Sequence, residues 1–206
     1  MIVFLMLLTP QTRQSLSPSE FVDRVSSTYG RLNSFSADFE QISEELSNHR
    51  GVQRGHVYLK TGNRARFDYV SPQMKSEYYD GKNVTQYSPE IKQAFQYPVN
   101  QANGDLLAII RVVGNRETPW KNYFEEYRET LGAPGSNRVV RLVPKNKDLK
   151  TVEIEVDPTT FFIVRMVMTA VDGRRNEFKF TNIKTAPLPD SYFKFEPPPG
   201  VKVIKE

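Results

Sequence analysis

The 206-residue chain contains no cysteine and only two histidines, His49 and His56. The lack of cysteine excludes disulfide bonds, thiol catalysis, cysteine-ligated metal sites and a lipid attached to an N-terminal cysteine. The two histidines do not have a spacing typical of metal ligands, and we expect both to lie at the surface. The sequence therefore predicts no metal site and no cofactor.

Sequence signatures of catalysis are also missing. There is no G-x-S-x-G element, P-loop or dinucleotide-binding fingerprint. Glu125 with Glu126, and Glu153 with Glu155, are adjacent or share a polar strand face, as solvated carboxylates do. We therefore expect no catalytic residues and no enzyme. A lipid hydrolase, the enzymatic alternative, would lack a recognisable nucleophile and base.

Neither sign of charge is concentrated in one segment. The chain has 28 Lys and Arg against 24 Asp and Glu, a net charge of +4, and the charges are interspersed. Nucleic-acid-binding proteins instead carry a clustered basic stripe, so nucleic acid is not an expected partner. The small basic excess suits a solvated surface, or contact with an acidic partner or an anionic membrane surface.

The sequence has no apolar run long enough to cross a bilayer, which takes about 20 residues. The short apolar run at residues 2–8 predicts the core of an export signal. We therefore expect a signal-like N-terminal segment at residues 1–18 and a periplasmic protein. No basic residue precedes the run and no Ala-x-Ala site follows it, so a buried N-terminal strand or helix is the alternative.

Apolar and polar residues alternate through most of the chain, which predicts about ten short antiparallel strands. Asp80-Gly81 and Asp172-Gly173 mark hairpin turns. The predicted strands are residues 35–41, 56–60, 66–69, 78–79, 84–87, 91–97, 139–143, 152–156, 162–168 and 177–180. The closing segment 193–201 is expected to be extended and constrained by its prolines.

Two helices interrupt this alternation. Residues 19–32 have an apolar face with helical spacing, which predicts an amphipathic helix. Residues 105–113 are apolar on nearly every side, so a helix there must be buried, with Asp105 as its cap and Gly114 at its end. The pattern favours a single, mainly β (α+β) domain over residues 19–206, with a strongly curved antiparallel sheet or barrel and helices over its concave side.

Nine apolar side chains are predicted to share the inner face of this sheet. Two of them are methionines, which adapt to irregular surroundings. The nine are Phe39, Phe67, Tyr69, Ile154, Val156, Met166, Met168, Phe178 and Phe180. Taken alone, such a face is more often an ordinary core than a ligand cavity.

Several segments resemble, in their order and spacing, the LolA family of periplasmic outer-membrane lipoprotein carriers. They are residues 35–41, 55–60, 64–69, 79–84, 156–183 and 193–201, and the resemblance extends roughly over 20–204. It implies an unclosed antiparallel β-barrel around a hydrophobic cavity, with helices as a lid. It also implies a carrier that binds the acyl chains of lipoproteins and ferries them from the inner to the outer membrane.

The resemblance assigns roles to residues and partners. The nine inner-face residues become the lipid-binding cavity, and Leu106, Leu107, Ile109 and Ile110 become the lid. Many family members hold the lid with an arginine in an Arg-Pro turn where this chain has Thr61-Gly62, so Arg64 and Arg66 are the candidates for lid control. The implied partners of the monomer are acylated lipoproteins, an inner-membrane lipoprotein-releasing transporter, an outer-membrane acceptor and, transiently, the membrane surface.

Other functions remain open from the sequence. A LolA-like module could bind another envelope lipid or glycolipid, or sense mislocalised lipoproteins. A purely structural envelope protein is a further alternative. The acceptor-type relative of the carrier is disfavoured because it needs a lipidated cysteine, which this chain lacks.

Overall fold

The computed structural model describes residues 16–45, 50–102, 107–110, 124–130, 136–145 and 148–206. The predicted signal-like segment lies largely outside these residues, and so do Asp105, Leu106, Gly114 and His49. No helix of the described chain is long and apolar enough to cross a membrane.

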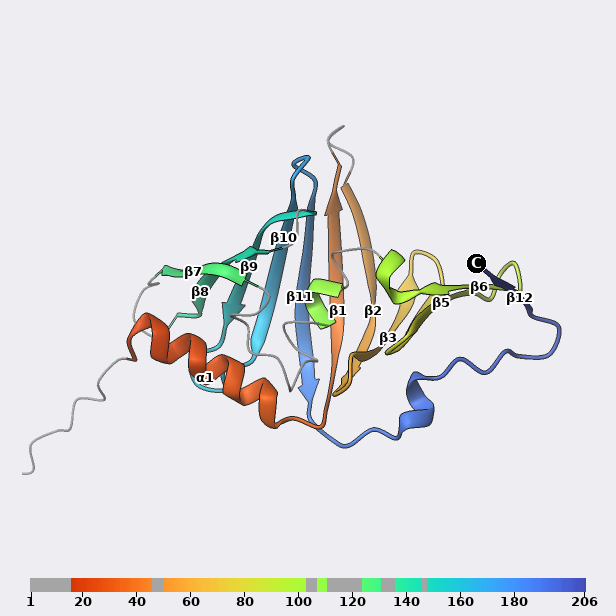
Figure 1. Cartoon of the computed structure of the whole chain (residues 1–206), viewed down its shortest axis with the longest axis horizontal. Coiled ribbons are helices and arrows are strands. Elements are labelled where there is room, and N and C mark those ends of the chain that lie inside the picture. Colours follow the sequence, from red (N-terminus) through yellow and green to blue (C-terminus); the bar gives the residue numbers. More distant parts are fainter. Residues whose placement is uncertain (1–15, 46–49, 103–106, 111–123, 131–135, 146–147) are drawn as a thin grey trace, which may run out of the picture.

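The strands form one curved sheet with a helix against one side (Figure 1). The helical elements are α1 (Pro18–Arg31) and the short 3-10 helices η1 (Val99–Gln101) and η3 (Asp190–Phe193). The strands are β1 (Ser34–Glu44), β2 (Arg50–Lys60), β3 (Arg64–Ser71), β4 (Lys75–Asp80), β5 (Asn83–Ser88), β6 (Gln93–Pro98), β7 (Phe124–Thr130), β8 (Arg138–Pro144), β9 (Leu149–Val156), β10 (Ile163–Ala170), β11 (Arg175–Lys184) and β12 (Lys202–Lys205).

The sheet contains twelve strands in the order β12-β6-β5-β4-β3-β2-β1-β11-β10-β9-β8-β7. Every neighbouring pair is antiparallel except β12 and β6. Within the described chain, the end strands β7 and β12 do not pair with each other, so the barrel is not closed. The predicted mainly β, unclosed antiparallel architecture is therefore confirmed, with twelve strands instead of about ten.

The prediction for the C-terminal segment was incomplete. After its prolines the chain adds β12 to the sheet, parallel to β6, with Lys202 opposite Gln93 and Ile204 opposite Phe95. A four-residue strand is too short to show an alternating pattern, and a parallel partner distant in sequence leaves no local turn signal. The extended segment was therefore expected, but its pairing was not.

Helix α1 confirms the first predicted helix to within a residue at each end. Ser17 caps it: its hydroxyl accepts from the Glu20 N–H at 3.4 Å, and the Glu20 carboxylate accepts from the Ser17 N–H at 2.9 Å. Phe21, Val25 and Tyr29 are buried against the sheet. The helix crosses the lower ends of the strands around β8–β10 in Figure 1, so it covers one rim of the sheet.

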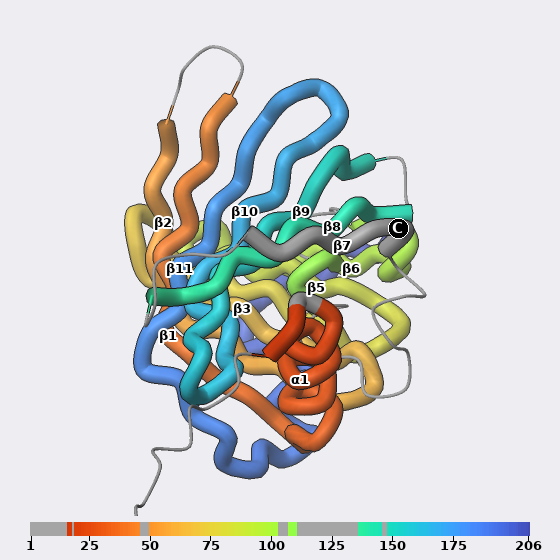
Figure 2. The backbone as a smooth tube through the Cα atoms, turned by 90° about the vertical axis from the view of Figure 1, so that its left-hand side faces the viewer, coloured from red at the N-terminus to blue at the C-terminus, as the bar shows by residue number. Residues whose placement is uncertain are grey.

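The two rims of the sheet therefore differ. Antiparallel order places the β1–β2, β3–β4, β5–β6, β8–β9 and β10–β11 connections at the rim opposite to α1, which we call the upper rim. The β1–β2 and β10–β11 ends extend furthest on this side (Figure 2). The β2–β3, β4–β5 and β9–β10 connections lie at the lower rim.

Candidate functional site: the apolar interior

Aromatic rings from three parts of the sheet meet on its inner face. The ring centroid of Phe39 on β1 lies 5.1 Å from that of Tyr69 and 6.2 Å from that of Phe67, both on β3. It lies 5.7 Å from the centroid of Phe178 on β11, whose ring stacks on Phe180 at 6.1 Å. The alternation of β-strand side chains brings these residues together, because each occupies an inward position of its strand.

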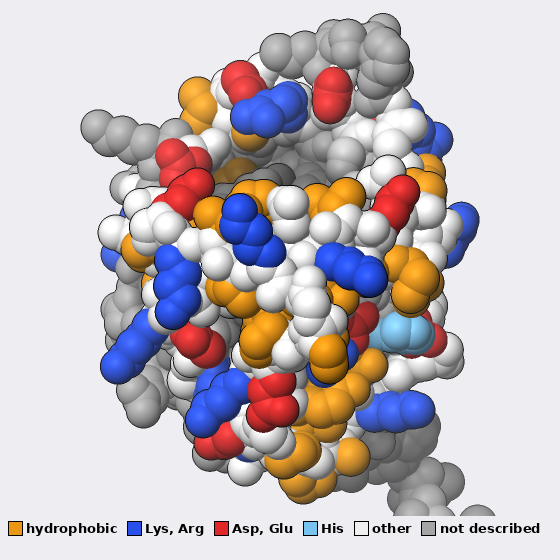
Figure 3. Space-filling view, turned by 90° about the vertical axis from the view of Figure 1, so that its right-hand side faces the viewer, with side chains coloured by type: hydrophobic (Ala, Val, Ile, Leu, Met, Phe, Trp, Pro, Cys, Tyr) orange, Lys and Arg blue, Asp and Glu red, His pale blue; other side chains and the backbone are white. Residues whose placement is uncertain are grey.

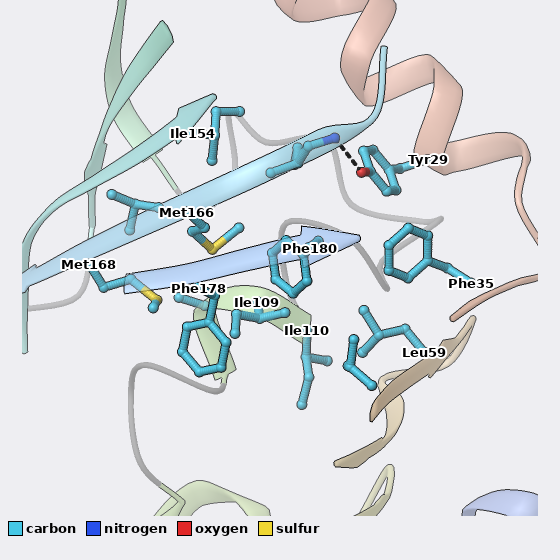
Figure 4. Packing of buried hydrophobic residues seen from close by; sticks show 14 of the residues in the cluster. Tyr29, Phe35, Leu59, Ile109, Ile110, Ile154, Met166, Met168, Phe178 and Phe180 are labelled. Carbon is cyan, nitrogen blue, oxygen red and sulfur yellow. Dashed lines mark hydrogen bonds between the residues drawn. The ribbon is translucent and has the colours of Figure 1, made fainter. Parts of the chain in front are cut away.

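The methionines form the other side of the same interior. Met166 on β10 is opposite Phe178 on β11 and Ile154 on β9, and Met168 follows two positions later. Figure 4 shows Met166 between Ile154 and Phe178, and Met168 on the near side of Phe178. Together with Val156, all nine residues predicted for the inner face belong to one buried cluster.

The helical residues 107–110 lie inside this curve. Ile109 and Ile110 are buried, Leu107 is partly buried, and all three contact the cluster. Figure 4 places Ile109 and Ile110 beside Phe178, Phe180 and Leu59. The predicted lid residues that the structure describes are therefore next to the predicted cavity residues.

Sequence reasoning missed several members of the cluster. Tyr79 on β4, Leu59 on β2 and Phe35 on β1 are buried in it, and each was visible as an inward position of an alternating strand. The same alternation includes Val57, Ala65 and Val152, whereas Val84, Val140 and Leu142 lie on strands for which no inner-face residue was predicted.

A polar pair, Glu77 and Lys75, interrupts the apolar inner face on β4. Glu77 on β4 is buried beside the Tyr79 ring, whose hydroxyl donates to Glu77 Oε2 at 3.4 Å, and Lys75 Nζ lies 3.3 Å from Glu77 Oε1. Lys75 Nζ also lies 4.1 Å from the centre of the Tyr69 ring. Burial, followed by the charge of Glu77, raises the pKa of Tyr69 and Tyr79 far above its usual value, so both hydroxyls stay protonated.

Arg64 and Arg66, the candidates for lid control, lie on the other face of β3. Arg64 Nη1 is 2.7 Å from Asp190 Oδ2, and Arg64 Nε donates to the Thr61 carbonyl at 3.2 Å. The Arg66 guanidinium lies 4.6 Å from the centre of the Tyr192 ring and pairs with Asp68 at 2.9 Å. In the described structure, both arginines therefore contact the outer face and η3.

The C-terminal segment is held on this outer face by several contacts. Lys60 Nζ lies 2.6 Å from Asp190 Oδ1, and the Lys60 and Arg64 hydrogen bonds lower the pKa of Asp190 to about 2. Phe193 is fully buried, and Phe195 lies 5.4 Å from the Tyr78 ring. Seen from the β12 end, hydrophobic side chains gather between charged ones (Figure 3).

The described histidine is also on the outer face. His56 Nδ1 lies 2.6 Å from Asp38 Oδ1, and both side chains are exposed, as predicted for His56. Hydrogen bonds from Asn182 first, then from His56, lower the pKa of Asp38. Among the described residues, no group of three or more His, Asp or Glu is arranged to hold a metal ion.

Solved structures define the class of this fold. An uncharacterized conserved protein from Thermus thermophilus matches with a TM-score of 0.55 and 16% identity, covering 93% of this chain and 100% of that one. A LolA superfamily protein from Nitrosomonas europaea matches with a TM-score of 0.50 and 12% identity, covering 88% and 99%. These likenesses show that the chain has the same fold as these two proteins.

Sequence comparison identifies the family within that class. The family model described as "Outer membrane lipoprotein carrier protein LolA" matches residues 30–196. Proteins named "Outer-membrane lipoprotein carrier protein" are similar: that of Proteus mirabilis is 28% identical over 180 residues (84% of this chain, 82% of the relative). That of Pasteurella multocida is 27% identical over 195 residues (91% and 90%). The chain belongs to the outer membrane lipoprotein carrier protein LolA family.

Proposed function

We propose that this protein is a periplasmic carrier, with no enzymatic activity, that binds lipoprotein acyl chains against its inner face and ferries them from the inner to the outer membrane. An inner-membrane transporter would supply the cargo and an outer-membrane acceptor would receive it. One observation carries the proposal: the nine predicted cavity residues and Ile109 and Ile110 form one apolar cluster inside an unclosed sheet. The names of its relatives point to the same cargo.

The chemistry of the interior suits acyl chains. Each methylene group left in water costs about 0.8 kcal/mol, so a carrier must shield most of a lipid anchor. Aromatic rings offer large apolar surfaces, and Met166 and Met168 can adapt to chains of different shape. Binding must still be reversible, which favours an interior whose contents can be exchanged.

Cargo binding can be tested directly. Purified protein is mixed with a synthetic triacylated lipopeptide in detergent, the detergent is removed, and the protein fraction is examined by mass spectrometry. We expect the lipopeptide to co-elute and the same peptide without acyl chains not to do so. Lipids that co-purify from the envelope would separate this function from a module for another lipid or glycolipid. No lipopeptide in the protein fraction would contradict the proposal.

In this proposal the lid consists of Leu106, Leu107, Ile109 and Ile110. Ile109 and Ile110 occupy the interior of the described structure, so cargo would displace them. Because the chain has no cysteine, a single Ile110→Cys substitution gives a specific reporter. We expect a maleimide to react slowly with the empty protein and faster with the loaded one, whereas Met74→Cys, at an exposed position, should react equally in both. Equal protection of Ile110→Cys in both states would exclude this lid movement.

Arg64 and Arg66 are kept as candidates for lid control. Their described contacts are with Asp190, Asp68 and Tyr192, so any influence on the lid would pass through β3. If so, Arg66→Lys should change the maleimide rate of Ile110→Cys in the empty protein. An unchanged rate would remove Arg66 from this role.

Membrane contact is proposed for the upper rim. The four most exposed large hydrophobic side chains of the described chain, Val70, Met74, Ile91 and Val171, are 49%, 67%, 57% and 64% exposed. All four lie at or beside the β3–β4, β5–β6 and β10–β11 connections. Single exposed apolar residues are common on protein surfaces, but turns usually favour polar residues. It is therefore unusual that these four hydrophobic side chains all lie at one rim. A transient contact with the bilayer would explain their position.

A further inference from the structure

A polar pocket lies on the inner face at the upper rim, between the ends of β1, β9, β10 and β11. Its volume is about 420 Å³. Its lining is mostly polar or charged: Gln41, Ser43, Glu44, Glu45, Asp148, Leu149, Ala170, Arg174, Arg175 and Asn176. Such a lining suits a polar group and is a poor surface for an acyl chain.

This pocket begins where the apolar interior ends. Gln41 is opposite Phe178, and the next inward position, Ser43, is opposite Asn176. Asn176 is in turn opposite Met168. A ligand whose apolar part contacts Phe178 and Met168 would therefore have its polar part beside Gln41 and Asn176.

Gln41 is the unusual residue of the pocket. The inward positions before it on β1 are Phe35, Ala37 and Phe39, and Gln41 itself is only 7% exposed. Its Nε2 donates to Asn176 Oδ1 at 3.1 Å, but its buried Oε1 has no hydrogen-bond partner in the part of the chain that the structure describes. Because this carbonyl has no donor from the described protein, it is available to accept a hydrogen bond from a ligand in the pocket.

We propose that this pocket binds the amide group at the root of the acyl chains, with Gln41 Oε1 accepting a hydrogen bond from its N–H. The inference rests on the proposed carrier function and deepens it, since it assigns recognition of the acylated residue to one side chain. Both arginines at the pocket's edge already have carboxylate partners: Arg175 Nη1 lies 3.3 Å from Glu44 Oε2, and Arg174 Nε lies 2.8 Å from Asp172 Oδ2. An uncharged amide therefore suits the pocket better than an anionic group does. The carrier would thereby distinguish a lipoprotein anchor from a lipid without an amide.

The test compares two ligands and two variants. Dissociation constants are measured for a synthetic tripalmitoyl-cysteinyl peptide and for palmitate, which has no amide. Gln41→Leu removes the carbonyl and keeps the bulk. Gln53→Leu is the matched control, because Gln53 is the cross-strand neighbour of Gln41 on β2 and is not part of the pocket lining.

We expect Gln41→Leu to weaken lipopeptide binding roughly five- to tenfold, the effect of one hydrogen bond, and to leave palmitate binding unchanged. Equal lipopeptide affinity of wild type and Gln41→Leu, or an equal loss for palmitate or in Gln53→Leu, would overturn the assignment while leaving the carrier function intact. Failure of the wild type to bind the lipopeptide would overturn both.

Discussion

At the scale of single residues, Tyr29 joins α1 to the sheet. Its buried hydroxyl accepts a hydrogen bond from the Ile163 N–H at 2.7 Å, at the start of β10. We expect Tyr29→Phe to lower the free energy of unfolding by about 1–3 kcal/mol, because the buried N–H loses its partner. Urea denaturation followed by circular dichroism measures this. Tyr87→Phe, a tyrosine whose ring packs on Phe195 at the outer face, is the control and should change stability little.

Asp190 makes the stability of the folded protein depend on pH in the acidic range. Hydrogen bonds from Lys60 and Arg64 lower its pKa to about 2 from an ordinary value of 3.8. A lowered carboxyl pKa stabilises the folded state above the unfolded value and loses this contribution as the pH falls through the folded value. We therefore expect wild type to lose more stability than Asp190→Asn between pH 5 and pH 2, as urea midpoints would show. Parallel losses in the two proteins would contradict this.

At the scale of elements, the C-terminal segment is attached by one fully buried ring. Phe193, the last residue of η3, has no exposed surface, whereas Phe195 is half-buried between Tyr78 and Tyr87. We expect Phe193→Ala to reduce the free energy of unfolding by about 3–5 kcal/mol. Phe195→Ala should cost clearly less in the same urea titration, and an equal cost would show that burial does not anchor the segment at Phe193.

The elements show where sequence reasoning succeeds. The spacing of Phe21, Val25 and Tyr29 predicted α1, and Asp80-Gly81 and Asp172-Gly173 predicted two hairpins, because these signals are local. The position of β12 beside β6, and the contacts of Asp190 with Lys60 and Arg64, join residues that are far apart in sequence. No periodicity records such pairings, so they required the structure.

The site was predictable to a similar degree. Strand alternation placed Phe39, Phe67 and Phe178 on one face, and the apolar run around Ile109 indicated a buried segment. Gln41 was visible only as a polar residue at an inward position. The lack of a hydrogen-bond partner for its carbonyl, and the pocket beside it, depend on the register between β1 and β11. That register could not be predicted from the sequence alone.

At the scale of the whole molecule, the exposed hydrophobic and basic side chains at the upper rim lead us to predict membrane binding. Arg50, Lys92 and Lys150 are exposed near this rim, form no ion pair with any described residue, and can attract anionic lipids. We expect the protein to float with vesicles of phosphatidylethanolamine and phosphatidylglycerol, and less so with phosphatidylcholine. Met74→Ser combined with Val171→Ser should reduce this binding several-fold.

Leu16→Ser is the control for this experiment. Leu16 is 37% exposed but precedes α1, away from the upper rim, so its loss should leave vesicle binding unchanged. If all three proteins float equally, or if wild type does not float at all, the rim is not a membrane-binding surface.

Because β7 and β12 do not pair with each other in the described structure, the volume of the interior is not fixed. A closed barrel has a radius fixed by its strand number and stagger, and it cannot widen without breaking backbone hydrogen bonds. In the described sheet β7 and β12 are end strands that do not pair with each other. Small changes in twist between neighbouring strands can therefore move these end strands apart while every strand pairing stays intact. We therefore expect the volume of the interior to increase with the number and length of the acyl chains that it encloses.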